Sequence, residues 1–516
     1  MVRFKLPSLD DSTYLFGEES GRGRGISEEL EVAKHKCSNS NKKLTMPIRV
    51  SATLADPPQL QRQERRSRRG WNVRASNFAT GTVNPIRVVI EDMKLAPNPE
   101  KKMISLSIGD PTVAGHLKPC EAILNSVEKS LQSFKFNGYA PSTGHLEARE
   151  AVARYSTLPG APIESKDVVL TSGCSHALEL AISVLANPGQ TILVPRPGFP
   201  LYKTLAESLG INIKYYSLLP EKSWEVDLAD LEHQISADTA AIVVNNPSNP
   251  CGSVYSRRHL QSILEVAARN YVPIIADEIY EQFVFPGEEF YPIASLSLSV
   301  PILTCSGLTK RFLVPGWRMG WILIHDRNDV FGSSVRNGLQ SLCQRIMGTN
   351  TIVQGALPNI LKDTPQNFFN DVIMSVKVNA SIAFSVLSEI PGLTPVMPSG
   401  AMYMMVGIDI NTFSGLRNDT EFVEKLVCEQ SVMCLPGACF DYPNYVRLVL
   451  TVPESDLREA CNRITEFCKK YSKFSFSLDH KPLHSRSNIL APIEEDMPCC
   501  ENNNNGVMES PRPIRV

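Results

Sequence analysis

The central part of the chain alternates between continuous apolar runs and segments with helical periodicity. The runs VVL, TILVP, AAIVV, VPIIAD, VPILTC and GWILI begin at residues 168, 191, 240, 272, 300 and 320. Between the first two, Leu178, Ala181, Ile182 and Leu185 mark one face of a helix that Asn-Pro-Gly ends. Apolar strands separated by helices predict an α/β fold, with a mostly parallel sheet covered by helices on both faces.

The charge balance and the cysteines limit the classes of partner and compartment. Lys and Arg number 52 against 54 Asp and Glu, a formal charge of −2, so no global field favours nucleic acid or an anionic membrane. The sequence contains no run of about 18 apolar residues and no apolar signal region near its start. The 13 cysteines are scattered without CxxC spacing, which is typical of reduced thiols in a cytoplasmic protein. A mitochondrial leader is the weaker alternative, because clustered acids interrupt the first 75 residues.

Both ends of the chain differ in composition from its centre. Residues 1–73 are polar and highly charged and include GRGRG and QRQERRSRRG. Such a sequence buries too little apolar surface to offset the entropy of ordering, so we predict a disordered leader over 1–73. The low-complexity sequence at the other end predicts a disordered tail over 476–516. Binding of RNA or a partner by the arginines is an alternative for the leader, and a solvated segment is the simpler interpretation.

Polar motifs follow several of the apolar runs, and ligands of such sheets bind at the carboxyl ends of the strands. TSGCSHA (171–177) reads as a strand, a glycine turn and a helix start, where backbone N–H groups can hold a phosphate. An ordinary strand–helix turn explains the same residues and is favoured for this motif alone. His176 is more typical of a packed or surface histidine than of a catalyst. Neither GxxxxGK[ST] nor GxGxxG occurs, which excludes the common nucleotide fingerprints.

Two further motifs place amides and a carboxylate at strand ends. VVNNPSNPCG (243–252) forms a rigid turn that projects Asn245, Asn246 and Asn249. In PIIADEIY, Asp277 ends a fully apolar strand, where a carboxylate is costly unless it meets a cation or hydrogen-bond donors. A helix N-cap is the competing interpretation of Asp277.

The stretch SGLTKRFLVPGWRMGW (306–321) places Lys310 and Arg318 on either side of a Pro-Gly turn. A solvated basic loop would explain the two cations, and so would a shared small anion. A lysine near a phosphate site, an aspartate that holds a ring nitrogen protonated and a stacking aromatic together describe a pyridoxal phosphate pocket. In that pocket Lys310 would bind the cofactor covalently, and the guanidinium of Arg318 would return to its phosphate.

The motifs NNPSNPCG, ADEIY and SGLTKRFLVPGWRMGW resemble those of class I aminotransferases, in the fold-type I group of pyridoxal phosphate enzymes. Four longer stretches resemble the animal branch of this family that acts on tyrosine: residues 84–112, 137–144, 193–211 and 398–410. The resemblance covers roughly residues 70–475 and implies a large domain, with a mostly parallel seven-stranded sheet flanked by helices, and a smaller α+β domain. The implied boundaries are 74–115 for an N-terminal arm with part of the small domain, 116–372 for the large domain and 373–475 for the small C-terminal domain.

The resemblance also implies catalytic roles. Lys310 would carry the cofactor and then move a proton between the substrate Cα and C4′ of the cofactor. Asp277 would pair with the ring nitrogen, whose proton affinity an opposite charge raises. Tyr280 and Asn249 would hydrogen-bond the phenolic oxygen of the ring.

The remaining cofactor contacts follow from the same resemblance. Phe199 would stack on the ring, with Tyr202 as its neighbour. Arg318 would lie behind the phosphate, and Tyr139 would reach in from the second subunit of a homodimer. The implied phosphate cradle consists of Ser172, Gly173, Cys174 and Ser175.

For the substrate, the resemblance implies that Arg447 clamps the α-carboxylate by a bidentate pair, with Gly109 and Asn249 beside it. From its residues alone, YVRLVLT suggests that Arg447 is an exposed strand arginine. One position departs from many relatives, which carry a serine three residues before the lysine; here it is Gly307. Phosphate contacts would then rest on Thr309, Ser306 or backbone donors.

The implied function is a transaminase with no metal, which converts L-tyrosine and 2-oxoglutarate to 4-hydroxyphenylpyruvate and L-glutamate, the first step of tyrosine catabolism. Alternatives with the same pocket are a kynurenine-, alanine- or methionine-type aminotransferase and a carbon–sulfur lyase. A more remote alternative is a binding protein that kept the fold and lost the chemistry. The leader shows no helix-turn-helix periodicity, and the lysine, aspartate and two arginines are all present, which favours retained catalysis.

Overall fold

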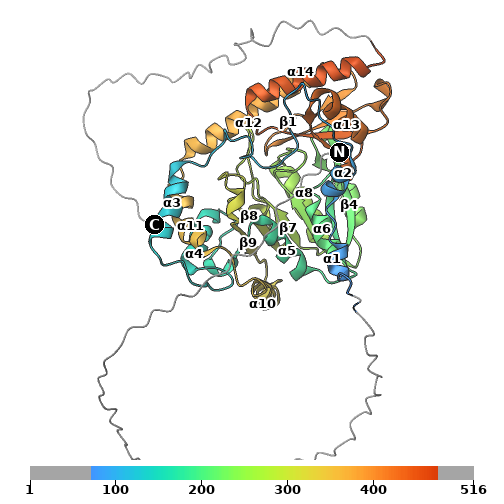
Figure 1. Cartoon of the computed structure of the whole chain (residues 1–516). Coiled ribbons are helices and arrows are strands. Elements are labelled where there is room, and N and C mark those ends of the chain that lie inside the picture. The colour runs from blue at the N-terminus through green and yellow to red at the C-terminus, as the bar shows by residue number, and fades with distance from the viewer. Residues whose placement is uncertain (1–70, 72, 475–516) are drawn as a thin grey trace, which may run out of the picture. The chain divides into compact units, whose positions relative to one another are not determined.

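The computed structural model describes Trp71 and residues 73–474 (Figure 1). The predicted leader, apart from Trp71 and Val73, and the predicted tail lie outside the described residues. The strands are β1 Ile104–Ser105, β2 Val168–Thr171, β3 Thr191–Arg196, β4 Asn212–Leu219, β5 Glu225–Val226, β6 Thr239–Asn245, β7 Ile274–Asp277, β8 Ile302–Gly307, β9 Gly320–His325, β10 Leu393–Pro395, β11 Tyr403–Ile408, β12 Val432–Met433, β13 Leu435–Pro436 and β14 Tyr445–Val449. The α-helices are α1 Asn77–Gly81, α2 Pro85–Asp92, α3 Glu121–Gln132, α4 Leu146–Ser156, α5 Cys174–Leu185, α6 Leu201–Ser208, α7 Leu228–Gln234, α8 Arg257–Arg269, α9 Ile293–Leu296, α10 Gly332–Cys343, α11 Thr351–Asp363, α12 Gln366–Leu387, α13 Asp419–Gln430 and α14 Glu454–Tyr471.

The larger sheet has the strand order β2-β9-β8-β7-β6-β3-β4-β5. Strands β8, β7, β6, β3 and β4 run parallel, whereas β9 is antiparallel to both β8 and β2. The seven expected strands are present, and the two-residue β5 pairs antiparallel with β4 and extends the sheet to eight. The predicted mostly parallel α/β fold is confirmed.

Alternating side chains of the central strands pack against different sets of helices. Val243, Ile275 and Leu303 belong to a core shared with α5, α6 and α10. Their neighbours in sequence, such as Ile242 and Ile274, belong to a second core shared with α7, α8 and α9. Both faces of the sheet are therefore covered, which explains why these strands are apolar throughout rather than alternating.

The second part of the fold is an antiparallel sheet of order β10-β11-β14-β13 with helices α12, α13 and α14 beside it (Figure 1). This α+β arrangement agrees with the predicted fold class, while the exact domain boundaries stay predictions. Register places Met405 of β11 opposite Arg447 of β14. Arg447, to which the resemblance assigns the substrate carboxylate, thus belongs to this smaller sheet.

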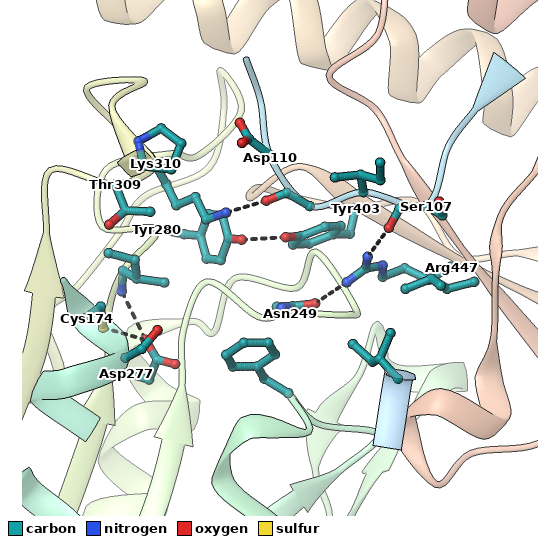
Figure 2. Close-up of a pocket in the computed structure, with 18 of the residues that line it drawn as sticks. Ser107, Asp110, Cys174, Asn249, Asp277, Tyr280, Thr309, Lys310, Tyr403 and Arg447 are labelled. Carbon is teal, nitrogen blue, oxygen red and sulfur yellow. Dashed lines mark hydrogen bonds between the residues drawn. The ribbon is translucent and has the colours of Figure 1, made fainter. Parts of the chain in front are cut away.

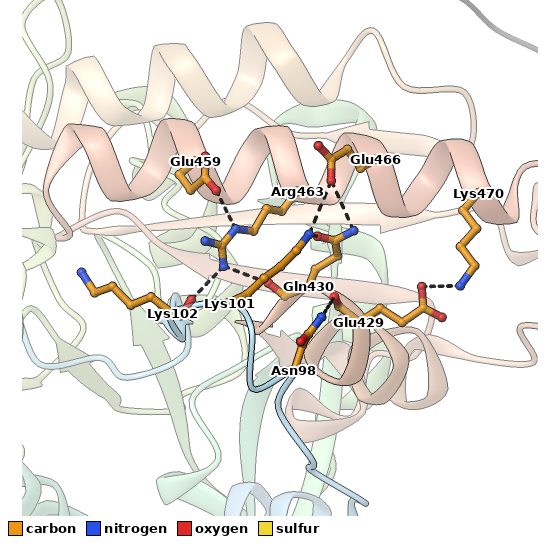
Figure 3. Close-up of polar contacts among 9 residues, drawn as sticks. All are labelled: Asn98, Lys101, Lys102, Glu429, Gln430, Glu459, Arg463, Glu466 and Lys470. Atoms are coloured by element: carbon orange, nitrogen blue, oxygen red, sulfur yellow. Dashed lines mark hydrogen bonds and ion pairs between the residues drawn. The ribbon is translucent and has the colours of Figure 1, made fainter.

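The N-terminal segment before the site is anchored to the C-terminal helices. Strand β1 pairs in parallel with β12, and Arg463 of α14 donates from Nη1 to the carbonyls of Lys102 at 2.8 Å and Gln430 at 3.0 Å (Figure 3). Glu459 pairs with Nε of the same arginine at 2.7 Å, and Asn98 Nδ2 donates to the Glu429 carbonyl at 3.0 Å. These contacts fix the start of the segment that continues to residues 107–110 in the site described below.

Three properties of the described residues bear on the expectations about membranes, metals and redox state. None of the helices in this part of the chain is long and apolar enough to cross a membrane. Across Trp71 and residues 73–474, no group of three or more His, Cys, Asp or Glu side chains is placed to hold a metal ion. The ten cysteines in these ranges are free thiols.

Candidate active site

A cavity of about 520 Å³ lies where the carboxyl ends of the parallel strands meet the smaller sheet (Figure 2). Its walls include the end of β7, the segments that follow β6 and β8, the start of α5, residues 107–110, and strands β11 and β14. The predicted site residues that line the cavity are Gly109, Cys174, Ser175, Phe199, Asn249, Asp277, Tyr280, Lys310, Arg318 and Arg447. The chain thus gathers in one place motifs that are more than 300 residues apart in sequence.

Asp277 ends β7 and is 2% exposed. Tyr202 donates its hydroxyl proton to Oδ2 at 2.6 Å, and the Cys174 thiol lies 3.7 Å from Oδ1 as a weak donor. Burial raises the pKa of Asp277, whereas the donor from Tyr202, the Ile279 backbone N–H and the Cys174 thiol lower it. The positive charge of Lys310 lowers the pKa of Asp277 as well. A buried carboxylate that several donors support suits a ligand that brings a positive nitrogen.

Lys310 projects from the turn after β8, and its Nζ donates to the carbonyl of Gly109. The same Nζ lies 5.9 Å from the ring centroid of Tyr280. Two segments that are separate in sequence therefore hold the amine inside the cavity (Figure 2). The lysine is placed to attack a carbonyl carbon or to exchange a proton with a ligand atom.

Gly307, where the resemblance led us to expect a serine, has a packing reason. A Cβ at Gly307 would lie 2.6 Å from the Met319 carbonyl oxygen and 2.7 Å from Gly320 Cα. Of the two substitutes expected for that serine, Thr309 lines the cavity. Ser306 is not among the residues that line the cavity, and its Oγ donates to the Glu278 carbonyl at 3.3 Å.

The start of α5 and Arg318 lie side by side at the predicted phosphate cradle, of which Cys174 and Ser175 line the cavity. Gly173, the N-cap, has φ 76°, and a Cβ there would lie 2.5 Å from Nη2 of Arg318. That arginine adopts φ 52°, which lets its guanidinium double back and donate to the Ser172 carbonyl at 3.1 Å. The backbone N–H of Ser172 is already used, because it donates to Nδ1 of His176 at 3.2 Å. The helix N-terminus and the guanidinium together make a site for an anion.

Tyr139 is 86% exposed in this chain and does not belong to the residues that line the cavity. Its predicted role was a contact from a second subunit. That role stays a prediction.

Arg447 is buried in β14, at 3% exposure, so the interpretation of this residue as an exposed strand arginine was wrong. Nη1 donates to Oδ1 of Asn249 at 3.0 Å and Nη2 donates to the carbonyl of Ser107 at 2.7 Å. Its Nε finds no hydrogen-bond partner among the described residues. Burial lowers the pKa of this guanidinium. A buried cation that lines the cavity suits a carboxylate ligand.

Aromatic side chains complete the cavity. Phe199 meets Tyr202 edge to face, with ring centroids 5.8 Å apart. Tyr280 hydrogen-bonds through its hydroxyl to that of Tyr403 at 2.7 Å. Sequence reasoning assigned no role to Tyr403. It also did not predict that Tyr202 hydrogen-bonds to Asp277. Tyr403 lies in the stretch 398–410 that resembles the aminotransferase family, but from its residues alone this apolar stretch indicates a core residue equally well.

The arrangement fits pyridoxal phosphate when each group is tested separately. The cradle closed by Gly173 and Arg318 suits a phosphate, the buried Asp277 suits a protonated ring nitrogen, and Lys310 suits an aldehyde carbon. Arg447, a second cation that lines the cavity, suits another anion such as a substrate carboxylate.

Comparison with known proteins gives a consistent result. Residues 101–464 match the model of the family described as aminotransferase class I and II. The chain is 56% identical to tyrosine aminotransferase of Mus musculus over 434 residues, which are 84% of this chain and 96% of that protein. It is 59% identical to tyrosine aminotransferase of Homo sapiens over 401 residues, which are 78% of this chain and 88% of that protein. Among solved structures, tyrosine aminotransferase of Leishmania infantum superposes with a TM-score of 0.75 at 34% identity, covering 78% of this chain and 100% of that one.

Proposed function

The chain belongs to the class I and II aminotransferases, and we propose that it transfers the amino group of L-tyrosine to 2-oxoglutarate, with 4-hydroxyphenylpyruvate and L-glutamate as products. The observation that carries this proposal is the cavity in which Lys310, Asp277 and Arg447 meet. L-tyrosine is proposed as the amino donor because this chain matches tyrosine aminotransferases over most of their length.

We infer that pyridoxal phosphate is the cofactor and that the predicted residues hold it. Asp277 would face the ring nitrogen, Phe199 the ring, and Tyr280 the phenolic oxygen. The backbone at Cys174 and the guanidinium of Arg318 would bind the phosphate. When bound, the cofactor withdraws electrons from the substrate Cα and so lets that carbon lose its proton.

The protein's own groups then perform the proton movement and the positioning. Arg447 binds the carboxylate that amino acid and oxo acid share, so one clamp serves both halves of the reaction. Lys310 Nζ would take the proton from the substrate Cα as general base and deliver it to C4′ of the cofactor as general acid, and its contact with the Gly109 carbonyl holds the amine in the cavity. Tyr202 donates to Asp277, and this hydrogen bond favours the charged carboxylate against burial, which raises the pKa of Asp277.

A homodimer is part of the proposal. Phe134, Tyr139 and Met347 are 78%, 86% and 60% exposed. Their two segments are joined by the Thr351 hydroxyl, which donates to the Phe136 carbonyl at 2.6 Å. A group of exposed apolar side chains on neighbouring segments supports a protein–protein contact. Size-exclusion chromatography with light scattering distinguishes a dimer from a monomer. We further propose the cytoplasm as compartment, which the scattered cysteines support.

The experiment that tests the function is product analysis with a panel of amino donors. The purified protein is loaded with pyridoxal phosphate and incubated with 2-oxoglutarate and L-tyrosine, L-kynurenine, L-alanine or L-methionine. The proposal predicts that L-tyrosine gives the highest kcat/KM and equal amounts of L-glutamate and 4-hydroxyphenylpyruvate. Faster turnover of another donor would assign a different specificity, and release of a sulfur compound from a thioether donor would assign a lyase.

A further inference from the structure

Tyr403 lies between three other residues that line the candidate site, namely Tyr280, Arg447 and Gly109 (Figure 2). It begins β11 and is 1% exposed. Its hydroxyl oxygen is 2.7 Å from that of Tyr280, and the guanidinium carbon of Arg447 lies 4.3 Å from its ring centroid. Its hydroxyl also approaches the backbone of Gly109, where an added Cβ would lie 2.6 Å from it. One side chain thus contacts the residues assigned to the cofactor oxygen and to the substrate carboxylate.

These contacts join the two sheets of the molecule. Tyr403 and Arg447 come from β11 and β14, which pair antiparallel in the smaller sheet. Tyr280 follows β7 of the larger sheet. The hydrogen bond between the two tyrosine hydroxyls is therefore a direct polar contact from one sheet to the other, made inside the cavity rather than at its rim.

The hydroxyl of Tyr403 is not needed to fill space, because phenylalanine would fill the same volume without a polar atom to satisfy. A buried hydroxyl without a partner is destabilising, so its presence indicates a hydrogen-bonding role. A tyrosine hydroxyl donates one proton and also accepts. If Tyr280 directs its proton to a ligand oxygen, it must accept the proton of Tyr403. A chain of two such bonds makes Tyr280 a stronger donor than it would be alone.

We propose that Tyr403 is a positioning residue with two separable parts. Its hydroxyl orients Tyr280 toward the phenolic oxygen of the cofactor, and its ring face holds the Arg447 guanidinium in place for the substrate carboxylate. The inference rests on the proposed function and assigns to that site a residue that joins its cofactor half to its substrate half.

Two substitutions separate the parts. Tyr403→Phe removes the hydroxyl and keeps the ring, while Tyr403→Leu removes both. For the first readout, the absorbance of the bound cofactor is followed while the pH of the cofactor-loaded protein is varied. The quantity compared is the pH at which half of the absorbance change has occurred, called the pH midpoint below. The second is the dissociation constant of 3-(4-hydroxyphenyl)propionate, a carboxylate that lacks the reacting amine. Tyr216→Phe is the matched control, because Tyr216 is also 1% exposed and its hydroxyl donates to the Val243 carbonyl at 2.7 Å, within the core of the larger sheet.

Tyr403→Phe should raise the pH midpoint by roughly 0.3 to 1 unit, because a weaker Tyr280 donor stabilises the ionised oxygen less. The dissociation constant of the carboxylate should stay within about twofold. Tyr403→Leu should raise the midpoint as well and weaken carboxylate binding by roughly threefold to thirtyfold. The control should change neither quantity.

A double-substitution cycle with Tyr280→Phe tests the chain of hydrogen bonds. If Tyr403 acts through Tyr280, the double variant should have the same midpoint as Tyr280→Phe alone. Additive shifts would overturn the hydroxyl part, and so would an unchanged midpoint in Tyr403→Phe. Equal loss of carboxylate binding in Tyr403→Phe and Tyr403→Leu would overturn the ring part. A wild-type protein that binds no cofactor would instead contradict the proposed function, which keeps the two failures distinct.

Discussion

Tyr202 donates its hydroxyl proton to Oδ2 of Asp277 at 2.6 Å, from helix α6 to the end of strand β7. Both residues are buried, and burial alone would raise the pKa of Asp277 and favour its neutral form. This hydrogen bond opposes that effect and stabilises the carboxylate. A neighbour from another element thus favours the charged form of the residue that we propose to face the cofactor nitrogen.

Tyr202→Phe should therefore weaken cofactor binding. Losing one hydrogen bond to a charged group should raise the dissociation constant of pyridoxal phosphate by about tenfold. The pKa of Asp277 would also rise further. As the pH is lowered, the affinity of the variant for pyridoxal phosphate should therefore start to fall at a higher pH than that of the wild type. Fluorescence titration of the cofactor between pH 5 and pH 9 measures both effects. An affinity equal to that of the wild type across this range would contradict the assigned role of Tyr202.

Lys310→Ala should lower kcat by at least about a thousandfold, because the proposed attachment point of the cofactor and the proposed proton carrier are lost together. Lys310→Arg is the matched variant, since it keeps the positive charge beside the Gly109 carbonyl but lacks a nucleophilic amine at neutral pH. Thermal unfolding of both variants should stay near that of the wild type. If Lys310→Arg retained wild-type turnover, the lysine would not be the catalytic group.

Arg447→Lys should raise the KM for L-tyrosine and for 2-oxoglutarate by similar factors, roughly tenfold to a hundredfold. A lysine keeps the charge but cannot reproduce the fork that reaches Asn249 and Ser107 at once. Steady-state kinetics with each substrate varied in turn gives the two factors. A change confined to one substrate would mean that the other carboxylate binds elsewhere.

Glu278→Gln should change how stability depends on pH. Burial raises the pKa of Glu278 from its ordinary value of 4.5 to about 8, with further contributions from Glu281 and Asp277. A carboxyl that keeps its proton in the folded state while the unfolded chain loses it lowers the free energy of unfolding as pH rises through this window. Each pKa unit corresponds to about 1.4 kcal/mol, so the loss is on the order of a few kcal/mol by pH 8.

The glutamine variant removes this titration and can still accept the Ile293 backbone N–H that Glu278 accepts at 2.9 Å. Relative to the wild type, it should be more stable near pH 8, and the difference should shrink as the pH falls toward 5. Chemical denaturation at several pH values measures the difference. A gap that stayed constant with pH would show that Glu278 is ionised in the folded protein.

The polar residues at the carboxyl ends of the parallel strands were the part of the site that could be predicted from the residues themselves. Asp277 and Lys310 each follow an apolar run, and parallel strands bring their carboxyl ends to one edge. For Arg447 the residues suggested the wrong environment, because YVRLVLT shows neither its strand partners nor its cover. Only the resemblance to aminotransferases indicated that it belongs to the site.

Contacts that depend on register between distant strands escaped sequence reasoning. Tyr403 and Tyr280 are 123 residues apart, and nothing in an apolar strand indicates where a hydroxyl finds its partner. The constraint on Gly307 also depends on register, since the Cβ it lacks would meet the facing strand at Met319 and Gly320. The strand β5 was not predicted, because two residues are too few to show a strand pattern in the sequence.

The central claim is that one cavity carries out both halves of a transamination, and an absorbance spectrum of the cofactor-loaded protein tests it most directly. The protein is mixed with stoichiometric L-tyrosine in the absence of any oxo acid, and 2-oxoglutarate is added afterwards. The account predicts that the long-wavelength band of the bound cofactor bleaches once and then returns, with one equivalent each of 4-hydroxyphenylpyruvate and L-glutamate released. A band that persists with L-tyrosine, or one that bleaches and does not return with 2-oxoglutarate, would contradict it.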